Sequence, residues 1–410
     1  HAPYIVGESI TVEFVPLYEP KRFAVKLFRF FYSYLIFTGT TRTLATLGAR
    51  ADMPPAGGNR HLAPVKWLIA NTLGRIPAIK KRVVPWLFDK VFTERPYAHL
   101  FEKYRPALVF AANLSMISDS ELLAEAQRRG VKTLGFACNW DHLNKYFIPR
   151  RADYLVVQNE PMKREAIEFQ GYEPGQITVT GFPKFDPYHD MARHVTTRAE
   201  FFRHFQIPEH MKLILFISGS AYSLDEGDIL ETIAQWIQQG RFKKHAQLMV
   251  RPYVMLRDRK QEEKKYKKLM KDPTILFNWS KGNEDEQALR LYRGMLYHAD
   301  VIISMFSTTA IEAALLDKPT IAIGFDGYAK RPPHQTIRRM ERMHHFRNVL
   351  DTGNVKVVRN FDQLFESIDT YLEHPEKDAD KRKEIVEKLC HGGDGLASKR
   401  VSDVILSLLK

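Results

Sequence analysis

The sequence predicts an α/β protein with two domains in tandem, each holding a parallel sheet covered by helices. Short apolar runs alternate with amphipathic stretches from residue 105 onward, and this alternation is typical of such sheets. A polar stretch with two prolines, residues 184–211, interrupts the alternation and looks like a linker. The chain has 410 residues, which is long enough for two separate cores.

The first hundred residues differ from the rest, because their pattern is helical and basic. Residues 10–15 predict a strand, which suggests that an earlier first strand of the N-terminal domain is missing. Between residues 20 and 100, aromatic residues such as Phe28, Trp67 and Trp86 alternate with lysine and arginine, which suits helices in a membrane interface. The alternative is that the aromatic residues are core and the lysines form a solvated face.

The remaining elements follow in order along the chain. In the N-terminal domain, residues 1–195, apolar runs predict strands at 107–111, 133–137, 154–157 and 177–180, with helices at 120–129 and 161–170. In the C-terminal domain, residues 207–395, they predict strands at 213–217, 247–250, 274–277, 301–303, 320–323 and 356–358. A last helix, residues 396–410, follows a glycine-rich turn.

The most informative stretch begins at the strand 301–303. The hydroxyl side chains of Ser304, Ser307, Thr308 and Thr309 follow it, and a short helix comes next. Hydroxyl and free N–H groups at a helix N-terminus bind phosphate, and ligands bind at the carboxyl edge of an open α/β sheet. Glu312, one turn into the helix, is placed to reach a ribose hydroxyl. The alternative is that the hydroxyl groups only cap their own helix.

Three other strand ends in the same half carry polar groups that suit a nucleotide. Gly219 and Ser220 form a small-residue loop that lets the backbone approach a phosphate or sugar. Arg251 follows the next strand and can pair with a diphosphate. Asn278 ends the strand after that, where it can meet a base edge. Four such strand ends in one domain predict a nucleotide site.

A second group of residues follows the strand 133–137. Trp140 can stack on a sugar, and Asp141 or His142 can remove a proton from a hydroxyl group. Asn144 and Lys145 are candidates for binding the acceptor. The alternative is a structural turn in which Asp141 caps a helix.

Other candidates lie outside these two groups. Asn113 follows the strand 107–111 and is predicted to contact the acceptor, while Asp119 and Glu121 nearby offer rival carboxylates. His345, which follows His344, is predicted to donate to a phosphate oxygen of the donor. The alternative for these adjacent histidines is an exposed polar pair.

Composition limits the kinds of partner. The formal net charge of +13 favours nucleotides, anionic lipid headgroups or nucleic acid. The two cysteines form neither a disulfide framework nor a zinc-ligand pattern, which fits a reducing cytosol. The sequence has no GxGxxG, GxxxxGK[ST] or HExxH motif, which argues against a redox domain, nucleotide hydrolysis and a metal site.

Three stretches are similar to a known family. They are residues 139–188, from NWDHL to VTGFPKFDPY, residues 299–323, ADVIISMFSTTAIEAALLDKPTIAI, and residues 393–409, GDGLASKRVSDVILSLL. The chain resembles the GT-B glycosyltransferases, near the CDP-glycerol glycerophosphotransferases and the UDP-N-acetylglucosamine 2-epimerase-like enzymes of bacterial surface carbohydrates. The second and third stretches are shared widely in that superfamily, so they indicate the fold better than the substrate.

The resemblance implies two Rossmann-like domains whose parallel sheets face each other across a cleft, with the C-terminal helix packed back on the N-terminal domain. It places the donor on the C-terminal domain, with its diphosphate held by residues 307–309 and its ribose near Glu312. The acceptor would lie on the N-terminal domain, and no cofactor or metal is expected. Two positions depart from the pattern: Tyr253 replaces a common histidine, which weakens the epimerase alternative, and His142 replaces an asparagine.

The functional hypothesis is a metal-independent glycosyltransferase that moves a sugar from a nucleotide-sugar to a surface polysaccharide, as in capsule or lipopolysaccharide, or to a lipid-linked glycan. Asp141 or His142 would be the base, while Arg251 and His345 would stabilise the departing nucleotide. The alternatives are a CDP-glycerol-type glycerophosphotransferase, a UDP-GlcNAc 2-epimerase-like enzyme, and a non-catalytic membrane-associated scaffold. We expect a cytoplasmic protein with peripheral membrane contact and no nucleic-acid partner.

Overall fold

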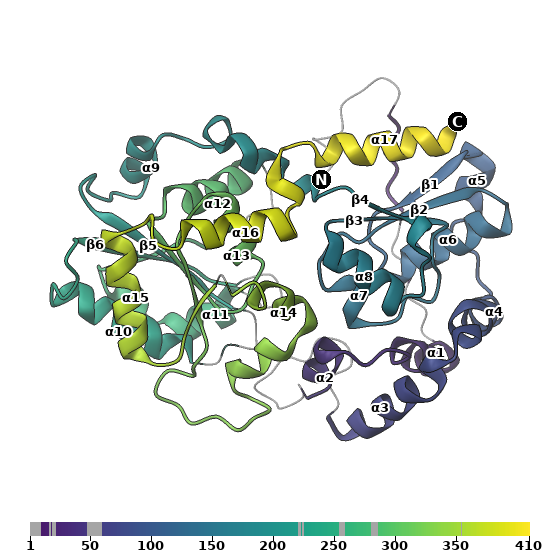
Figure 1. Cartoon of the computed structure of the whole chain (residues 1–410), viewed down its shortest axis with the longest axis horizontal. Helices are drawn as coiled ribbons and strands as arrows, with labels where there is room; N and C mark the ends of the chain where they lie inside the picture. Colours follow the sequence, from purple (N-terminus) through teal and green to yellow (C-terminus); the bar gives the residue numbers. More distant parts are fainter. Residues whose placement is uncertain are drawn as a thin grey trace.

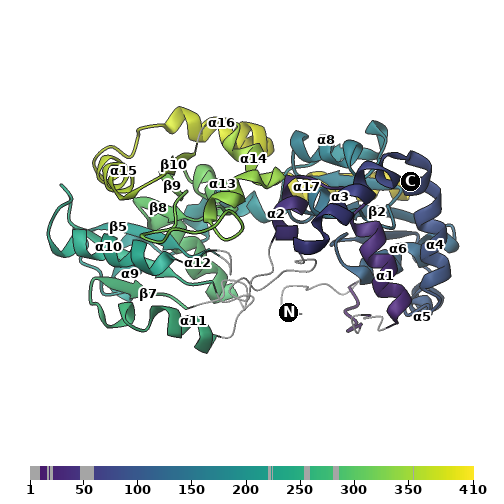
Figure 2. The ribbon, with the colours of Figure 1, turned by 90° about the horizontal axis from the view of Figure 1, so that it is seen from below.

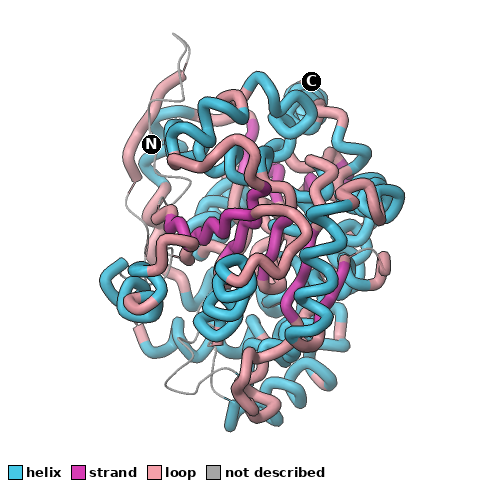
Figure 3. The backbone as a smooth tube through the Cα atoms, turned by 90° about the vertical axis from the view of Figure 1, so that its left-hand side faces the viewer, coloured by secondary structure: helices cyan, strands magenta, loops and turns pink. Residues whose placement is uncertain are grey.

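The computed structural model describes residues 10–15, 18, 22–46, 60–219, 223, 225–253, 259–279, 286–353 and 355–410. It has two lobes, each built around one parallel sheet (Figure 1). We call the part around the four-stranded sheet the N-terminal lobe and the part around the six-stranded sheet the C-terminal lobe. The strands lie inside and the helices surround them (Figure 3). The predicted α/β class with two parallel sheets is therefore confirmed.

The N-terminal lobe begins with helices and continues as alternating strands and helices. Its sheet has the order β1-β2-β3-β4, with every pair parallel. The elements are α1 (Phe23–Ser33), α2 (Gly39–Thr46), η2 (Arg60–Leu62), α3 (Ala63–Asn71), η3 (Leu73–Arg75), η4 (Ile79–Val83), α4 (Val84–Val91), α5 (Ala98–Tyr104), β1 (Leu108–Ala111), α6 (Ile117–Arg128), β2 (Lys132–Phe136), α7 (His142–Lys145), β3 (Tyr154–Val157), α8 (Glu160–Glu168), η5 (Pro174–Gln176) and β4 (Ile177–Val179).

The C-terminal lobe carries a larger sheet of the order β10-β9-β8-β5-β6-β7, again with every pair parallel. The elements are η6 (Pro183–Arg193), α9 (Arg198–His204), β5 (Lys212–Ile217), α10 (Glu226–Gln238), β6 (Ala246–Arg251), α11 (Arg259–Tyr266), η7 (Leu269–Lys271), β7 (Ile275–Phe277), α12 (Glu286–His298), β8 (Val301–Ser304), α13 (Thr309–Leu315), β9 (Thr320–Ile323), η8 (Ile337–Arg342), α14 (His344–Leu350), β10 (Lys356–Val358), α15 (Phe361–Glu373), α16 (Ala379–Leu389), η9 (His391–Gly393) and α17 (Ala397–Leu409).

The strand order of the larger sheet reverses between β5 and β8. β6 and β7 follow β5 on one side, whereas β8, β9 and β10 extend the sheet on the other side. In doubly wound α/β folds, loops diverge at such a switch point and leave a crevice at the carboxyl ends of the strands. The fold therefore favours a ligand site beside the ends of β5 and β8.

The C-terminal helix α17 returns to the N-terminal lobe and covers the open face of its sheet (Figure 1). Val404, Ile405 and Leu408 pack with Phe136 and Val156 of β2 and β3. The turn before α17 is tied to η6, because the Asp186 carboxylate accepts the N–H groups of Ala397 (2.9 Å) and Ser398 (2.7 Å). The predicted return of this helix is confirmed.

Two sequence-based expectations are wrong. Residues 10–15 form no strand; Glu13 instead pairs with Lys103 of α5 (2.9 Å), and Phe14 is 91% exposed. Alternating apolar residues form a strand only where a sheet edge pairs with them, and these residues lack that pairing. The predicted linker is also helical: it contains η6 and α9, whose N-terminus is fixed by a capping box between Thr197 and Glu200.

The basic aromatic helices divide their two faces between core and solvent. Phe28 of α1 packs with Phe88 of α4 in a buried cluster, as the core alternative predicts. On the other faces, Phe23 is 79% exposed and Trp67 and Trp86 are about half-exposed. None of the helices in the described part of the chain is long and apolar enough to cross a membrane.

Candidate functional site

Parallel pairing brings the predicted donor residues into one row at the carboxyl edge of the larger sheet. Ile217, the last residue of β5, pairs with Arg251 on one side and with Ser304 on the other. Asn278, after β7, donates its backbone N–H to the Val250 carbonyl (2.9 Å). The row thus lies at the carboxyl edge of the sheet and flanks the switch point between β5 and β8. Ser220, a further candidate in this row, lies outside the described residues.

Glu226 of α10 stabilises the Ser218–Gly219 turn at the end of β5. The buried Glu226 carboxylate accepts the Gly219 N–H (2.5 Å) and the Ser218 hydroxyl (2.6 Å) and pairs with Lys265 (2.6 Å). A Cβ atom on Gly219 would lie 2.2 Å from the Ser223 hydroxyl oxygen, so glycine is required by packing. The Gly219 N–H is therefore already occupied, and its contact with a donor stays a prediction.

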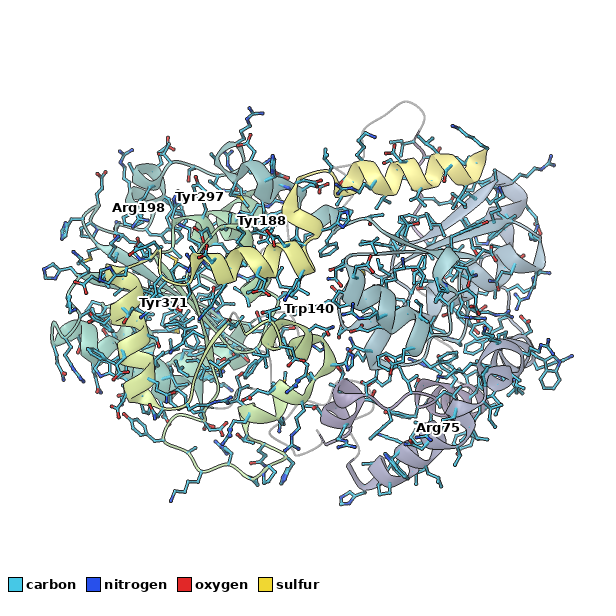
Figure 4. All side chains as sticks on the ribbon, viewed as in Figure 1. Arg75, Trp140, Tyr188, Arg198, Tyr297 and Tyr371 are labelled. Carbon is cyan, nitrogen blue, oxygen red and sulfur yellow. The ribbon has the colours of Figure 1, made fainter. Side chains whose placement is uncertain are left out.

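A chain of contacts joins Arg251, which belongs to this row of strand ends, to Glu312 of α13. The Arg251 guanidinium lies over the Tyr292 ring, 4.5 Å from its centroid. The hydroxyl groups of Tyr292 and Tyr188 donate to the two Glu312 carboxylate oxygens at 2.7 and 2.8 Å, and Lys184 pairs with Glu312 at 3.1 Å. Figure 4 shows Tyr188 on the C-terminal lobe, away from Trp140. We call these five residues the donor-side cluster.

Glu312 is buried and remains ionised. Burial raises its pKa, but the Lys184 charge and the two tyrosine hydroxyls outweigh this and hold the pKa below its usual value. The two tyrosines and Lys184 were missed by sequence analysis, because they come from η6 and α12 and meet Glu312 only in the fold. Both carboxylate oxygens already accept hydrogen bonds, and contact with a ribose stays a prediction.

Replacing Glu312 with alanine is expected to lower the free energy of unfolding by about 2–5 kcal/mol, because two buried tyrosine hydroxyls lose their acceptor. Urea unfolding followed by circular dichroism measures this. Glu312→Gln keeps one carbonyl acceptor in nearly the same volume and should lose clearly less. An unchanged urea midpoint for Glu312→Ala would mean that the donor-side cluster does not stabilise the fold.

The turn before α13 holds the predicted hydroxyl groups together. Ser307 Oγ accepts the Thr309 N–H (3.0 Å) and lies 2.7 Å from Thr309 Oγ1, which is the local capping role that the alternative describes. Thr308 precedes the helix and makes no side-chain cap. Ser304 ends β8 and is buried. Their role in holding a diphosphate stays a prediction.

A series of aromatic contacts connects this turn with the N-terminal lobe. Phe306 packs on Phe346 of α14 (5.9 Å between centroids), and Phe346 packs edge to face on Trp140 (5.6 Å). Trp140 also lies 5.4 Å from the His345 ring. In Figure 4, Trp140 stands between the two lobes. The structure thus places the predicted acceptor residue Trp140 and the predicted donor turn on two sides of one interlobe contact.

The neighbours of Trp140 include the other residues that are predicted to form the acceptor side. His142 Nε2 lies 3.1 Å from Asn139 Nδ2, which can only donate, so Nε2 holds a lone pair. Lys145 pairs with Asp141 one turn away (3.3 Å). His142 and Lys145 also line a cavity of about 380 Å³ beside α1. Asp141 precedes α7 but makes no side-chain cap, so the capping alternative is wrong.

The charges of this group favour a neutral imidazole beside a carboxylate. Burial lowers the His142 pKa, while the Asp141 charge partly restores it. Burial lowers the His345 pKa to about 4, again with Asp141 acting in the opposite direction. Burial raises the Asp141 pKa, but Lys145, His345 and His142 outweigh it and keep the carboxylate ionised. A neutral histidine next to an ionised carboxylate is a suitable general base.

A polar network holds the two lobes together at this point (Figure 2 shows α2 next to α14). Thr40 of α2 donates to Asn144 Oδ1 (2.8 Å) and accepts the His344 N–H (2.8 Å), so His345 Nδ1, 3.3 Å away, must donate to it. Asn144 also donates to Glu165 (2.9 Å), whose pKa burial raises to about 7. Asn144 is thus engaged inside the protein, and an acceptor contact stays a prediction.

The remaining candidates lie at two places. Asn113 accepts a hydrogen bond from Ser115 (2.7 Å), and Ser115 Oγ lies 3.4 Å from His142 Nε2, so Asn113 reaches the acceptor side through Ser115. The Asp119 carboxylate accepts the Asn113 N–H (2.6 Å) and so stabilises the loop between β1 and α6. Glu121 is buried on α6, where burial raises its pKa to about 8. Within the described residues, no group of three or more His, Cys, Asp or Glu side chains is arranged to hold a metal ion.

The chain was compared with protein families and with solved structures. The sequence profile of the family described as CDP-Glycerol:Poly(glycerophosphate) glycerophosphotransferase matches residues 130–407. A comparison with curated proteins gave no significant match. The UDP-GlcNAc 2-epimerase from Neisseria meningitidis bound to UDP-GlcNAc is 15% identical over 81% of this chain and 82% of that chain, with a TM-score of 0.50.

Two further structures are similar. MnaA from S. aureus in complex with UDP is 13% identical over 79% of this chain and 82% of that chain, with a TM-score of 0.50. The wall teichoic acid polymerase TagF is 10% identical over 80% of this chain and 97% of that chain, and its TM-score of 0.46 is too low to support an assignment by itself. At these identities the likenesses establish the fold alone, and they confirm the predicted GT-B architecture.

Proposed function

The chain belongs to the CDP-glycerol:poly(glycerophosphate) glycerophosphotransferase family, and from this premise we propose that it transfers glycerol phosphate from a CDP-linked donor to a hydroxyl group of a cell-surface polymer. Family membership makes the protein a transferase of surface-polymer synthesis. The observation that supports the finer proposal is the meeting of two groups across one contact. Trp140, which precedes Asp141 and His142 in the chain, contacts the turn after β8 through Phe346 and Phe306.

The proposed step is a displacement at phosphorus. The oxygen of the acceptor hydroxyl bonds to the phosphorus that carries glycerol, and the bond from that phosphorus to the oxygen of the CMP phosphate breaks. The products are a phosphodiester and CMP, and the hydroxyl proton passes to the enzyme. Positioning and charge stabilisation supply most of the acceleration in phosphoryl transfer.

In this proposal the residues on the two sides of the contact between Trp140 and Phe346, which we call the interlobe centre, have different roles. His142 Nε2 accepts the hydroxyl proton, and the Asp141 charge stabilises the imidazolium that forms. The 380 Å³ cavity beside His142 admits the acceptor end. Arg251, whose guanidinium lies over the Tyr292 ring, pairs with the diphosphate and offsets the charge that develops on the departing CMP.

A nucleotide screen tests the donor side. We expect CDP and CMP to raise the melting temperature more than UDP, GDP or dTDP at equal concentration, because only a ligand that binds the folded state stabilises it. Sugar transfer, the hypothesis from sequence alone, is the alternative, and preference for UDP or GDP would favour it over the proposal. No shift with any nucleotide, together with vesicle binding, would favour the non-catalytic scaffold.

We also propose that the exposed side of α1, α3 and α4 rests on an anionic membrane. These helices gather along one side of the N-terminal lobe, in front in Figure 2. Trp67 and Trp86 are exposed there, and the exposed Lys26 and Arg82 supply positive charge. The acceptor-side cavity is lined by α1, so membrane contact would bring this cavity near a lipid-linked acceptor.

The double variant Trp67→Glu/Trp86→Glu is expected to bind phosphatidylglycerol vesicles at least about tenfold more weakly in co-sedimentation, because two aromatic side chains lose their burial in the interface. Tyr328→Glu, an exposed aromatic on the C-terminal lobe (70% exposed), is the matched control and should bind as the wild type does. Equal binding by both variants would rule out this face.

A further inference from the structure

A groove of about 990 Å³ opens on the C-terminal lobe between the loop after β9, the helices η8 and α14, and the start of α15. Seven of the side chains that line it are Lys or Arg, and two are Asp or Glu. We propose that this basic groove binds the phosphodiester chain of the acceptor polymer behind its reacting end. The proposal rests on the proposed function for the identity of the polymer.

Two of the seven cations are used to build the walls of the groove. Arg331 makes a two-pronged ion pair with Asp225 (2.9 and 2.5 Å), and Arg359 makes another with Glu341, with one contact of 2.8 Å. The second lining carboxylate, Asp326, accepts the Ile337 N–H (2.7 Å) and so fixes the start of η8. The two lining carboxylates, Glu341 and Asp326, are thus engaged in contacts that build the groove, and they do not neutralise its exposed lysine and arginine side chains.

Three other cations face solvent. Lys330, Arg338 and Arg342 are exposed, and the structure records no carboxylate partner for them among its described residues. Exposed arginines whose charge is not matched nearby favour phosphate, which they can bind with two parallel hydrogen bonds. The groove therefore presents an excess of positive charge in a concave surface large enough for an extended ligand.

The spacing of these cations favours a chain of phosphates over a single one. Lys330 lies on the loop, whereas Arg338 and Arg342 stand four residues apart on η8, which separates them by about 8 Å along a 3₁₀ helix. Arg347, on the next helix, lines the same groove but pairs with Asp351 (3.0 Å). The charges without a carboxylate partner in the described part of the chain are thus distributed along the loop and η8, where they can address more than one phosphate group.

The groove lies beside the contact between η8 and α2, which joins the two lobes. Arg342 ends η8, and His345 follows three residues later on α14, the helix that also carries Arg347. The Arg342 carbonyl lies against Gly39 of α2, where a Cβ atom would come within 1.9 Å of it. η8 thus forms part of the groove and also of the contact between the lobes, so the groove adjoins the lobe contact near which the proposed reaction occurs.

The aromatic residues of the groove argue against nucleic acid as its ligand. Sequence-independent binding of single strands relies on open aromatic faces that stack on bases. The two rings that line the groove, Phe325 and Phe361, pack edge to face on each other (5.0 Å), and Tyr328 covers Phe361 (4.5 Å). Neither ring that lines the groove is open for stacking, and the exposed Tyr328 ring beside them already lies against Phe361, which suits a polymer without bases.

The test is the binding of a fluorescein-labelled poly(glycerol phosphate) decamer, followed by anisotropy, to the triple variant Lys330→Ala/Arg338→Ala/Arg342→Ala. We expect its affinity to fall at least about tenfold at 0.1 M salt, and the slope of log K against log[salt] to fall by about two, because each lost phosphate contact removes roughly 0.7. All three side chains are exposed, so the melting temperature should not change.

The matched control is the variant Lys267→Ala/Lys383→Ala/Lys399→Ala, which removes the same charge from exposed sites elsewhere. Its affinity should stay within about twofold of the wild type. Equal losses in the two triple variants would overturn the proposal, because binding would then follow net charge alone. Binding of a ten-residue thymidine oligonucleotide as tight as that of the decamer would also overturn it in favour of a nucleic-acid groove.

A separate measurement distinguishes the basic groove from the proposed function. The groove variant should bind CDP as the wild type does and should transfer glycerol phosphate to a single uncharged glycerol acceptor at the wild-type rate. If wild-type protein binds the decamer in the groove but releases no CMP from CDP-glycerol, the proposed function fails and the groove stands. If transfer occurs but the groove variant keeps full decamer affinity, the groove proposal fails alone.

Discussion

Replacing His142 with glutamine is expected to lower kcat by about 10²- to 10⁴-fold, the usual contribution of a general base. The reason is the position of Nε2, which holds a lone pair at the edge of the acceptor-side cavity. Glutamine keeps a polar side chain of similar reach but cannot accept the proton. The affinity for CDP should stay unchanged, because His142 lies in the other lobe from the donor residues.

His374→Gln is the matched control for this variant. His374 is an exposed histidine that follows α15, and it belongs to neither the donor-side nor the acceptor-side residues. Its replacement should therefore leave kcat unchanged. A His142→Gln enzyme with wild-type kcat would show that the proton passes to another group, and Asp141→Asn would then be the variant to test for the larger loss.

The pH dependence gives a sharper test of the same pair. The base must be neutral, so kcat/KM falls as the pH drops through the pKa of His142, which burial holds below its usual value and the Asp141 charge raises in part. Asp141→Asn removes that charge and lowers the pKa further, so the acid limb of the profile should move to lower pH. A limb that moves to higher pH, or does not move, would contradict the assignment.

Replacing Arg251 with alanine is expected to weaken CDP binding by about 10- to 100-fold, which corresponds to the loss of one charge-assisted contact to a diphosphate. Isothermal titration calorimetry measures the change. Arg251→Lys keeps the charge but loses the guanidinium group, with its contact over the Tyr292 ring and its capacity for two parallel hydrogen bonds, so it should recover only part of the affinity.

Tyr292→Phe distinguishes the proposed contact of Arg251 with the donor from the stabilising role of the residues packed against Arg251. This variant keeps the ring under the guanidinium and removes the hydroxyl group, with its hydrogen bonds to Glu312 and to the Thr309 side chain. We expect CDP binding within about threefold of the wild type and a lower unfolding free energy. Unchanged CDP affinity in Arg251→Ala would remove Arg251 from the donor site, whatever Tyr292→Phe shows.

Local apolar pattern was enough to predict most strands. Strand β8 ends one residue beyond its expected bounds, because consecutive apolar residues such as Ile302 and Ile303 favour a strand in a sheet covered on both faces. Residues 10–15 show the limit of this reasoning. Their alternation is equally regular, but no sheet edge pairs with them, and pairing is a property of the whole fold.

The same limit applies to the candidate site. Sequence placed Ser304, Arg251 and Trp140 at strand ends, and parallel register brings them to the expected edges. It did not find Tyr188 or Thr40, whose partners Glu312 and His345 lie 124 and 305 residues away in the sequence. Such contacts carry no local pattern, because each residue alone resembles an ordinary core tyrosine or a helix threonine.

Product analysis with CDP-glycerol tests the central claim most directly. Wild-type protein, CDP-glycerol with radiolabelled glycerol, and a hydroxyl-terminated poly(glycerol phosphate) primer are incubated with EDTA, since no metal is expected to be needed. The account predicts one CMP released for each glycerol phosphate added to the primer, and neither product with His142→Gln on the same timescale. Release of CDP, label that stays in CDP-glycerol, or transfer from UDP-GlcNAc instead would contradict it.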